Sequence, residues 1–269
     1  MGIDAGAATT KAVILRDDTI AAYRIALTGF DFLHVAESIY RTVQADAGIQ
    51  GEDIEKVVAT GYGRENIEFA NKAVSEITAH AAGVHYLFPD VRGIIDIGGQ
   101  DSKVVAVENG RVVNFLMNDK CAAGTGKFLE LTAKALEVST EALGGLALAS
   151  RSPASISSMC TVFAESEVIS LRARGLTKED IAAGLVESIA QRVSVMAKQI
   201  GLKENVAFVG GVAKNAGIKA SLERKLGVTF FVPFEPQITG ALGGALHGKA
   251  EVLAGHEALL RSGAPLSKR

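Results

Sequence analysis

The sequence has few of the features that mark secreted, membrane-spanning or nucleic-acid-binding proteins. It contains two cysteines in 269 residues, which argues against the disulfide scaffold of a secreted protein. No apolar run is long enough to span a bilayer and no signal-peptide pattern is present, so we expect a cytoplasmic location and no membrane partner. Basic runs are absent apart from Lys268-Arg269 and the net charge is −2, so nucleic acid is not an expected partner.

What the chain does have is enough apolar sequence for a sizeable core. Apolar residues make up 48% of it, so disorder is not the default state, and its length predicts one or two domains. No low-complexity linker interrupts the chain, so we expect two halves in close contact. Only three residues precede Asp4, so we expect the first strand either to be clipped or to begin upstream of residue 1.

A short sequence motif near the beginning of the chain recurs 92 positions later. Ile3-Asp4-Ala5-Gly6 and Thr10-Lys11-Ala12-Val13 correspond to Ile95-Asp96-Ile97-Gly98 and Ser102-Lys103-Val104-Val105. Each copy continues through a polar turn, Asp17-Asp18 or Asn109-Gly110, between two alternating apolar runs. Each copy is therefore predicted to form a strand, an acidic turn with glycine, and a β-hairpin.

The remaining pattern alternates strands with helices and predicts an α/β fold. Helices are expected at 30–47, 76–88, 127–136, 159–173, 177–200, from 211 to about 226, and at 238–260. Buried strands are expected at 57–60, 206–209 and 228–232. Ser157 or Ser158 is placed to cap the helix at 159–173, and Thr177 is placed to cap the next one.

The two acidic turns carry groups suited to phosphate and Mg²⁺. Glycine permits close approach of backbone N–H groups to phosphate oxygens, and Mg²⁺ takes carboxylate oxygens together with waters and phosphates. A third glycine segment, Gly210-Gly211-Val212-Ala213 followed by Asn215, opens a helix after a strand and could contact an adenosine group. A single Asp-x-Gly turn would more often only end a strand, but two copies at one offset, followed by this third segment, favour nucleotide binding.

These three segments resemble the phosphate and adenosine motifs of the actin, hexokinase and heat-shock chaperone ATPases. The resemblance implies two duplicated ribonuclease-H-like domains with MgATP in an interdomain cleft. We expect a first lobe at 1–89, with the helix at 239–262 packed back on it, and a second lobe at 90–238. The expected nucleotide-binding residues are Asp4, Gly6, Thr9, Thr10, Lys11, Gly98, Gly99, Gly124, Gly126, Gly210, Gly211 and Asn215, and the expected catalytic residues are Asp96, Gln100 and Asp101.

Individual roles follow from the chemistry of these side chains. Thr9 and Lys11 are assigned to phosphate contact, Asp4 and Asp96 to the metal ion through waters, and Gly211 and Asn215 to the nucleoside. Either Gln100 or Asp101 would position the attacking water.

Each assignment has a simpler alternative. Lys11 could be a solvated strand residue, Asn215 a helix cap, and Asp101 the surface partner of Lys103. The five histidines show no metal-ligand spacing and are expected to be surface or core residues.

Cys121 and Cys160 each lie just before or at the start of an expected helix, where free N–H groups favour a thiolate. Three interpretations compete. The cysteines could be buried and inert, they could form a redox disulfide, or they could bind an iron–sulfur cluster. A four-iron cluster usually takes four thiolates, and one chain offers two, so a two-fold dimer would be required.

The cysteine segments favour the third interpretation. The stretch from Asn118 to Gly126, and the stretch Ser158-x-Cys160-Thr161-Val162-Phe163-Ala164-Glu165-Ser166-Glu167, resemble those of activators of 2-hydroxyacyl-CoA dehydratases. That family includes the ATPase subunits of benzoyl-CoA reductases. The resemblance implies a homodimer from an anaerobic metabolism, with one [4Fe-4S] cluster bridging its two subunits. Such a dimer would receive an electron from ferredoxin or flavodoxin and use ATP hydrolysis to donate it to a dehydratase or reductase that carries iron–sulfur clusters.

Three other functions remain open at this point. The chain could be the ATPase subunit of a benzoyl-CoA-type reductase, with a permanent partner. It could be a small-molecule kinase of the same superfamily, which needs a base and a substrate pocket but no cysteines. It could also be a non-enzymatic, ATP-dependent binding module.

Overall fold

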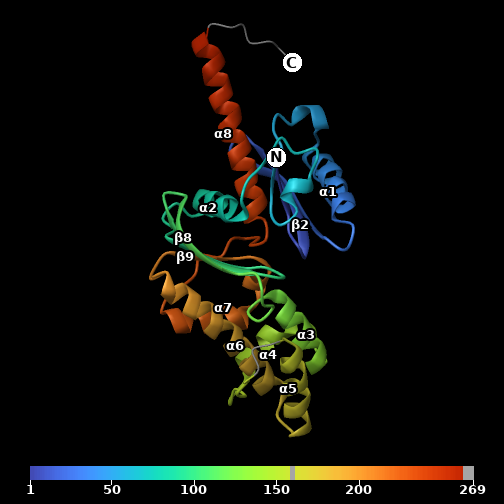
Figure 1. The fold of residues 1–269 in the computed structure, drawn as a ribbon, viewed down its shortest axis with the longest axis vertical. Helices are drawn as coiled ribbons and strands as arrows, with labels where there is room; N and C mark the ends of the chain where they lie inside the picture. The colour runs from blue at the N-terminus through green and yellow to red at the C-terminus, as the bar shows by residue number, and fades with distance from the viewer. Residues whose placement is uncertain (158–160, 263–269) are drawn as a thin grey trace. The chain divides into compact units, whose positions relative to one another are not determined.

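The computed structural model describes residues 1–157 and 161–262, which form two compact units (Figure 1). The first unit comprises Met1–Tyr86 and the stretch from Gln237 onward, and the second comprises Leu87–Pro236. Each unit is built on one sheet in which a β-hairpin continues into a parallel strand.

The sheet of the first unit has five strands in the order β3-β2-β1-β4-β5. Its strands are β1 (Gly2–Ala5), β2 (Thr9–Arg16), β3 (Thr19–Leu27), β4 (Val58–Thr60) and β5 (Lys72–Ala73). Its helices are α1 (Phe32–Ala47), α2 (Glu76–Leu87) and α8 (Thr239–Ser262), with short 3₁₀ turns at Gly51–Asp53 and Arg64–Asn66.

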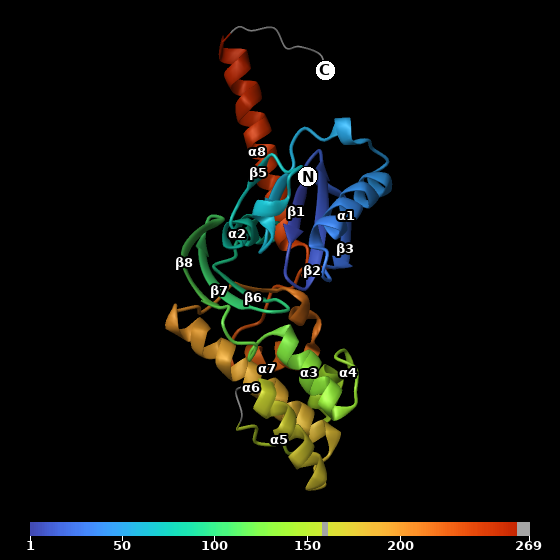
Figure 2. The same cartoon turned by 45° about the vertical axis from the view of Figure 1, so that its right-hand side comes forward.

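Two helices cover opposite faces of this first sheet (Figure 2). Ile3 of β1 packs in one hydrophobic cluster with Ile39 and Val43 of α1. Gly2, one residue earlier, faces the backbone of α8 at Ala241. Successive side chains of a strand point to opposite faces, so this alternation places α1 on one side and α8 on the other.

The sheet of the second unit has four strands in the order β8-β7-β6-β9. Its strands are β6 (Gly93–Ile97), β7 (Ser102–Glu108), β8 (Arg111–Asn118) and β9 (Val206–Val209). Its helices are α3 (Gly126–Leu136), α4 (Ala142–Ala149), α5 (Thr161–Ala173), α6 (Lys178–Gln199) and α7 (Ala216–Leu226), with a 3₁₀ turn at Gly211–Lys214. The core lies between β6, β7 and β9 and these helices, with Phe128, Phe208 and Leu185 among its fully buried side chains.

The 92-residue repeat in the sequence is also a repeat in the backbone. Both hairpins turn through two successive residues with left-handed φ, Asp17-Asp18 in one and Asn109-Gly110 in the other. This is the backbone of a type I′ turn, whose twist suits a two-residue hairpin. The register of each hairpin also shifts at the same place, between Ile14 and Leu15 and again between Ala106 and Val107. The predicted duplicated hairpins are therefore confirmed.

Most predicted helices lie within a few residues of their expected bounds, and Thr177 caps α6 by accepting a hydrogen bond from the Asp180 N–H at 3.2 Å. The strand predicted at 228–232 is wrong, because only Phe231 pairs, in an isolated parallel bridge with Ala207. Gly227 ends α7 and Pro233 lacks an N–H, so few residues remain that could extend the pairing. Helix α4 was not predicted. Met159 and Ser158 lie outside the described residues.

Candidate functional site

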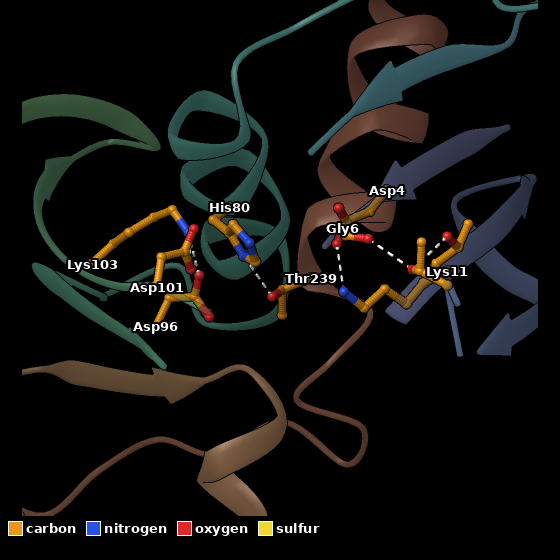
Figure 3. A network of polar contacts seen from close by, with 10 residues as sticks. Asp4, Gly6, Lys11, His80, Asp96, Asp101, Lys103 and Thr239 are labelled. Carbon is orange, nitrogen blue, oxygen red and sulfur yellow. Dashed lines mark hydrogen bonds and ion pairs between the residues drawn. The ribbon is translucent and has the colours of Figure 1, made fainter. Parts of the chain in front are cut away.

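The first acidic turn places Asp4, at the end of β1, opposite Lys11 of β2. The Lys11 Nζ lies 3.0 Å from Asp4 Oδ2, and both side chains are largely buried (Figure 3). The turn between them is closed by Thr28, whose hydroxyl donates to the carbonyl oxygen of Gly6 at 2.7 Å and bonds the hydroxyl of Thr10. Lys11 is therefore not a solvated strand residue, and its charge is held beside Asp4.

The second acidic turn repeats this pairing with one carboxylate more. Asp96 of β6 lies opposite Lys103 of β7, and the Lys103 Nζ lies 3.5 Å from Asp96 Oδ2 (Figure 3). The same nitrogen lies 2.7 Å from Asp101 Oδ1. The alternative pairing of Asp101 with Lys103 therefore occurs, but not on the surface, because the Lys103 side chain is only 3% exposed. The side chain of Gln100 is exposed.

A glycine follows the parallel strand in each unit and leaves room for the acidic residue. Gly61 follows β4 with φ 86°, and Gly210 follows β9 with φ 82°. A Cβ at Gly61 would overlap the Asp4 carboxylate, and one at Gly210 would lie 2.5 Å from Asp96 Oδ1. Only glycine combines this left-handed backbone with so close an approach. Gly210 was a predicted nucleotide-binding residue, whereas Gly61 directly follows the strand predicted at 57–60 and was assigned no role in the site.

The second acidic turn is bonded directly to the N-terminal end of α3. The N–H of Gly126 donates to the carbonyl oxygen of Gly98 at 2.9 Å, and the N–H of Lys127 donates to that of Gly99 at 2.7 Å. Two of the N–H groups at the start of this helix are therefore used by the turn itself. Gly124 precedes them with a left-handed φ of 90°.

The third glycine segment forms the 3₁₀ turn Gly211–Lys214, and Asn215 follows it as the N-cap of α7. The Asn215 side-chain oxygen accepts a hydrogen bond from the Ile218 N–H at 3.0 Å. The cap that was the simpler alternative for Asn215 is thus present. Contact with a nucleoside stays a prediction, for this residue and for Gly211.

Two residues near Asp4 carried no signal that distinguished them in the sequence. His80 of α2 is buried, and its Nδ1 lies 2.9 Å from the hydroxyl of Thr239, the first residue of α8 (Figure 3). A Cβ at the next residue, Gly240, would lie 3.1 Å from Asp4 Oδ2 and 3.3 Å from His80 Nε2. The chain segments that meet here are 159 positions apart, so spacing could not have identified them.

Cys121 is a free, half-buried cysteine in the segment that joins β8 to α3. The side-chain amide of Asn118 donates to the carbonyl oxygens of Cys121 at 2.9 Å and Ala123 at 3.0 Å, which fixes the segment. Cys160 lies outside the described residues, directly before the first described residue of α5. Within the described ranges, no group of three or more acidic, histidine or cysteine side chains could hold a metal ion.

The helices that follow the two cysteines are held together at their C-terminal ends. Arg172, in the last turn of α5, donates to the carbonyl oxygen of Ala135 in α3 at 2.5 Å and pairs with Glu137, just past α3, at 2.9 Å. This guanidinium lowers the pKa of the Glu137 carboxyl below its usual value. Side chains of both helices also share the core, among them Phe128 and Val168. The two helices thus run in the same direction, so their N-terminal ends lie at the same end of the pair.

The segment that leads toward Cys160 is anchored to the N-terminal end of α6. Asp180 Oδ1 accepts hydrogen bonds from the Ser150 hydroxyl at 2.7 Å and the Ser152 N–H at 3.1 Å, and its backbone oxygen accepts from Ala154 at 2.8 Å. The hydrogen bond from Ser150 is the main cause of a lowered pKa of the Asp180 carboxyl. Ser157, expected as a possible cap, instead donates from its N–H and hydroxyl to Glu167 Oε1, both at 2.8 Å.

Comparison with known proteins identifies the family. The sequence profile of the BadF/BadG/BcrA/BcrD ATPase family matches residues 1–248. The chain belongs to this family. The 2-hydroxyisocaproyl-CoA dehydratase activator of Clostridioides difficile is 49% identical over an alignment of 254 residues that covers 92% of this chain and 93% of that protein. The predicted family and ATPase class are thereby confirmed.

Solved structures of the family agree with the fold. The activator of the 2-hydroxyisocaproyl-CoA dehydratase from Clostridium difficile with bound ADPNP superimposes with a TM-score of 0.90 at 46% identity, over 96% of each chain. The (R)-2-hydroxyglutaryl-CoA dehydratase component A of Acidaminococcus fermentans gives 0.91 at 43% identity, over 94% of this chain and 98% of that one. A ROK hexokinase from Thermus thermophilus shares the fold alone, with a TM-score of 0.55 at 16% identity. The predicted actin-like, two-domain α/β fold is confirmed. None of the helices in the described ranges is long and apolar enough to cross a membrane.

Proposed function

We propose that this family member is an ATP-hydrolysing iron–sulfur activator that donates a low-potential electron to a 2-hydroxyacyl-CoA dehydratase. The observation that carries the proposal is the direct bonding of the second acidic turn to α3, since Gly98 and Gly99 bond the helix that begins five residues after Cys121. A change at the nucleotide can thus reach a candidate cluster ligand through backbone alone. The names of the similar proteins, activators of such dehydratases, support the same function.

In this proposal each acidic turn contributes to the nucleotide site in its own way. Lys11, with Thr9 and Thr10 beside it, contacts phosphate, and the glycines of the turns let backbone N–H groups approach phosphate oxygens. Asp4 and Asp96 hold Mg²⁺ through water, because Mg²⁺ usually keeps several waters and binds one or two carboxylates together with substrate phosphates. Gln100 or Asp101 positions the attacking water. Gly211 and Asn215 contact the nucleoside.

The residues around Cys121 fit a cluster held by thiolates. Cys121 is free and half-buried rather than sealed in the core, which argues against the inert alternative. The parallel run of α3 and α5, joined by Arg172, brings the helix start behind Cys121 and the one behind Cys160 to the same end of the pair. Helix N-termini favour negative charge, which suits thiolates and an anionic cluster. Two thiolates per chain would require a homodimer for one [4Fe-4S] cluster.

When bound, the cluster would store and pass on a single electron taken from ferredoxin or flavodoxin. The chain's own part is to tie the geometry of its cysteine segment to the state of the nucleotide. Movement of Gly98 and Gly99 on nucleotide turnover would pull on the first two residues of α3. Arg172 would then carry that movement to α5, because it bonds both helices. The proposed partner is a dehydratase or reductase with iron–sulfur clusters of its own.

Iron and sulfide analysis of oxygen-free protein tests the proposal. We expect about four irons per two chains and a dimer on size-exclusion chromatography. Cys121→Ala should lose the iron while keeping MgADP affinity, whereas Lys120→Ala, an exposed neighbour in the same segment, should keep both. Iron retained in Cys121→Ala would contradict the role of Cys121 as a cluster ligand. A colourless monomer that phosphorylates a metabolite would instead exclude the electron-donor function and favour a kinase.

A further inference from the structure

Lys103 is a buried cation shared by two carboxylates of one turn. The residue is 2% exposed, and its Nζ lies 2.7 Å from Asp101 Oδ1 and 3.5 Å from Asp96 Oδ2 (Figure 3). A buried ammonium is costly unless it is paired and hydrogen-bonded. Two carboxylates within 3.5 Å of one nitrogen would repel each other without it. Lys103 is thus the group that allows both to lie in this turn.

The corresponding lysine of the first unit has a different environment. Lys11 is 13% exposed at its side chain, against 3% for Lys103, and it pairs with the single carboxylate of Asp4. The repeat puts Thr9 where the second unit has Asp101. Lys11 and Asp4 cancel in charge, whereas Asp96, Asp101 and Lys103 keep one net negative charge. The neutral first pair leaves Lys11 suited to phosphate contact while Asp4 binds the metal through water, and the negative second group suits the metal cation, so we assign no phosphate contact to Lys103.

The carboxylate of Asp101 is folded back against its own turn. The N–H of Gly98 donates to the carbonyl oxygen of Asp101 at 3.0 Å and closes the turn. A Cβ at Gly98 would lie 2.9 Å from Asp101 Oδ1, so the carboxylate occupies the space over this glycine on its way to Lys103. Gln100, at the tip of the same turn, has an exposed side chain. An exposed amide can both donate to and accept from a water, as orienting a nucleophile requires.

We propose that Lys103 is the positioning residue that fixes Asp96 and Asp101, and that Gln100 rather than Asp101 orients the attacking water. The proposal rests on the proposed function in one respect, that Asp96 holds Mg²⁺. Asp101 then pairs with the Lys103 ammonium, and the carboxylate of Asp96 stays directed at the metal position. Removing Lys103 should disturb catalysis by displacing Asp96, not by removing a contact to the nucleotide.

Steady-state ATP hydrolysis of the holoprotein separates these roles. Lys103→Met keeps an unbranched side chain as far as Cε and removes the ammonium, and we expect kcat to fall at least about tenfold while the Kd for ADP measured without Mg²⁺ changes less than about threefold. Lys178→Met is the matched control, because Lys178 is an exposed lysine of the same unit whose ammonium donates to the backbone carbonyl of Glu137 at 3.1 Å, and this variant should hydrolyse ATP like the wild type. An unchanged kcat in Lys103→Met, or a loss confined to ADP affinity, overturns the positioning role.

A second pair of variants assigns the water-orienting residue. Gln100→Ala should lose at least about tenfold in kcat at unchanged KM, and Asp101→Asn should lose less kcat than Gln100→Ala, because an amide oxygen still accepts from Lys103. The reverse order would assign the water to Asp101 and overturn the proposal. If Lys103→Met does not fold, the double variant Lys103→Met/Asp101→Asn relieves the repulsion and should fold. Failure of the double variant to improve on Lys103→Met counts against the shared-cation role.

Iron content is measured on every variant of this series. The Gln100, Asp101 and Lys103 variants should all hold as much iron as the wild type, because Lys103 pairs with Asp96 and Asp101 of the acidic turn and the cluster is expected on the cysteines. Absence of iron in the wild type would defeat the electron-donor function and still leave the kcat comparison readable. The two proposals can therefore fail separately.

Discussion

His80 and Thr239 are joined by a hydrogen bond of 2.9 Å between the imidazole Nδ1 and the hydroxyl Oγ1, although 159 positions separate them. Both side chains are buried. The bond ties α2 to the first turn of α8, next to Gly240 and the Asp4 carboxylate. The acidic residue of the first turn therefore lies beside a contact between two segments that are far apart in the sequence.

Thr239→Val tests the worth of this contact, since valine keeps the shape of threonine without its hydroxyl. We expect a loss of about 1 kcal/mol in the free energy of unfolding, the usual net value of a hydrogen bond. Thr239→Ser keeps the hydroxyl and should be more stable than the valine variant. Urea unfolding measures both, and a valine variant as stable as the serine one would show that the bond contributes nothing.

Gly210→Ala should be costly both for the fold and for ATP hydrolysis. Gly210 has φ 82° and ψ 171°, a combination found almost only in glycine and costing another residue about 1–3 kcal/mol, and the added Cβ would also lie 2.5 Å from Asp96 Oδ1. Gly175→Ala is a matched control, because Gly175 has nearly the same φ, 84°, with no atom within 4 Å of the added Cβ. Only the Gly210 variant should lose ATPase activity. Equal losses of stability in the two variants would show that the turn at Gly210 can shift to accommodate the added Cβ without displacing Asp96.

Local signals allowed much of the fold to be predicted from the sequence. The hairpin turns Asp17-Asp18 and Asn109-Gly110 carry residue types that tolerate left-handed φ, and Thr177 caps α6 through a contact three residues away. Helix α4 was not predicted because its sequence, Ala142–Ala149, is apolar on all sides and contains glycine, so it lacks the amphipathic pattern of a surface helix. The predicted strand at 228–232 failed because its length depends on its partner β9 and on Pro233.

The acidic residues of the candidate site could be predicted from the sequence, but the buried side chains around them could not. Asp4 and Asp96 were found from the repeat, because both end a strand before a glycine turn. The burial of Lys103 could not be inferred, because a lysine in an alternating strand usually reaches solvent. His80 was missed for another reason, since its partner comes from the opposite end of the chain.

Acid should weaken the anchor of the segment that leads toward Cys160. The hydrogen bond from Ser150 lowers the folded-state pKa of Asp180, so this carboxylate contributes stability above its unfolded pKa of about 4. The contribution is lost as pH falls through the lower folded value. Asp180→Asn should therefore be less stable at neutral pH and show a flatter decline of the melting temperature on acidification. Ser150→Ala should act in the same direction, and an unchanged acid slope in both would contradict the linkage.

Removing the Arg172 contacts that join α5 to α3 should cause a loss of iron without a loss of nucleotide binding. Arg172→Met keeps the apolar stem but removes the bonds to Ala135 and Glu137, so the two helix starts behind the cysteines should be held less firmly. We expect chelator-driven loss of iron from the oxygen-free protein to be faster in this variant, with the Kd for MgADP unchanged. Arg174→Met, an exposed arginine two residues on, is the matched control and should lose iron at the wild-type rate. Equal rates of iron loss in the two variants would mean that the Arg172 contacts do not support the cysteine segments. A change at the nucleotide could then be passed on to α3 but not through Arg172 to α5.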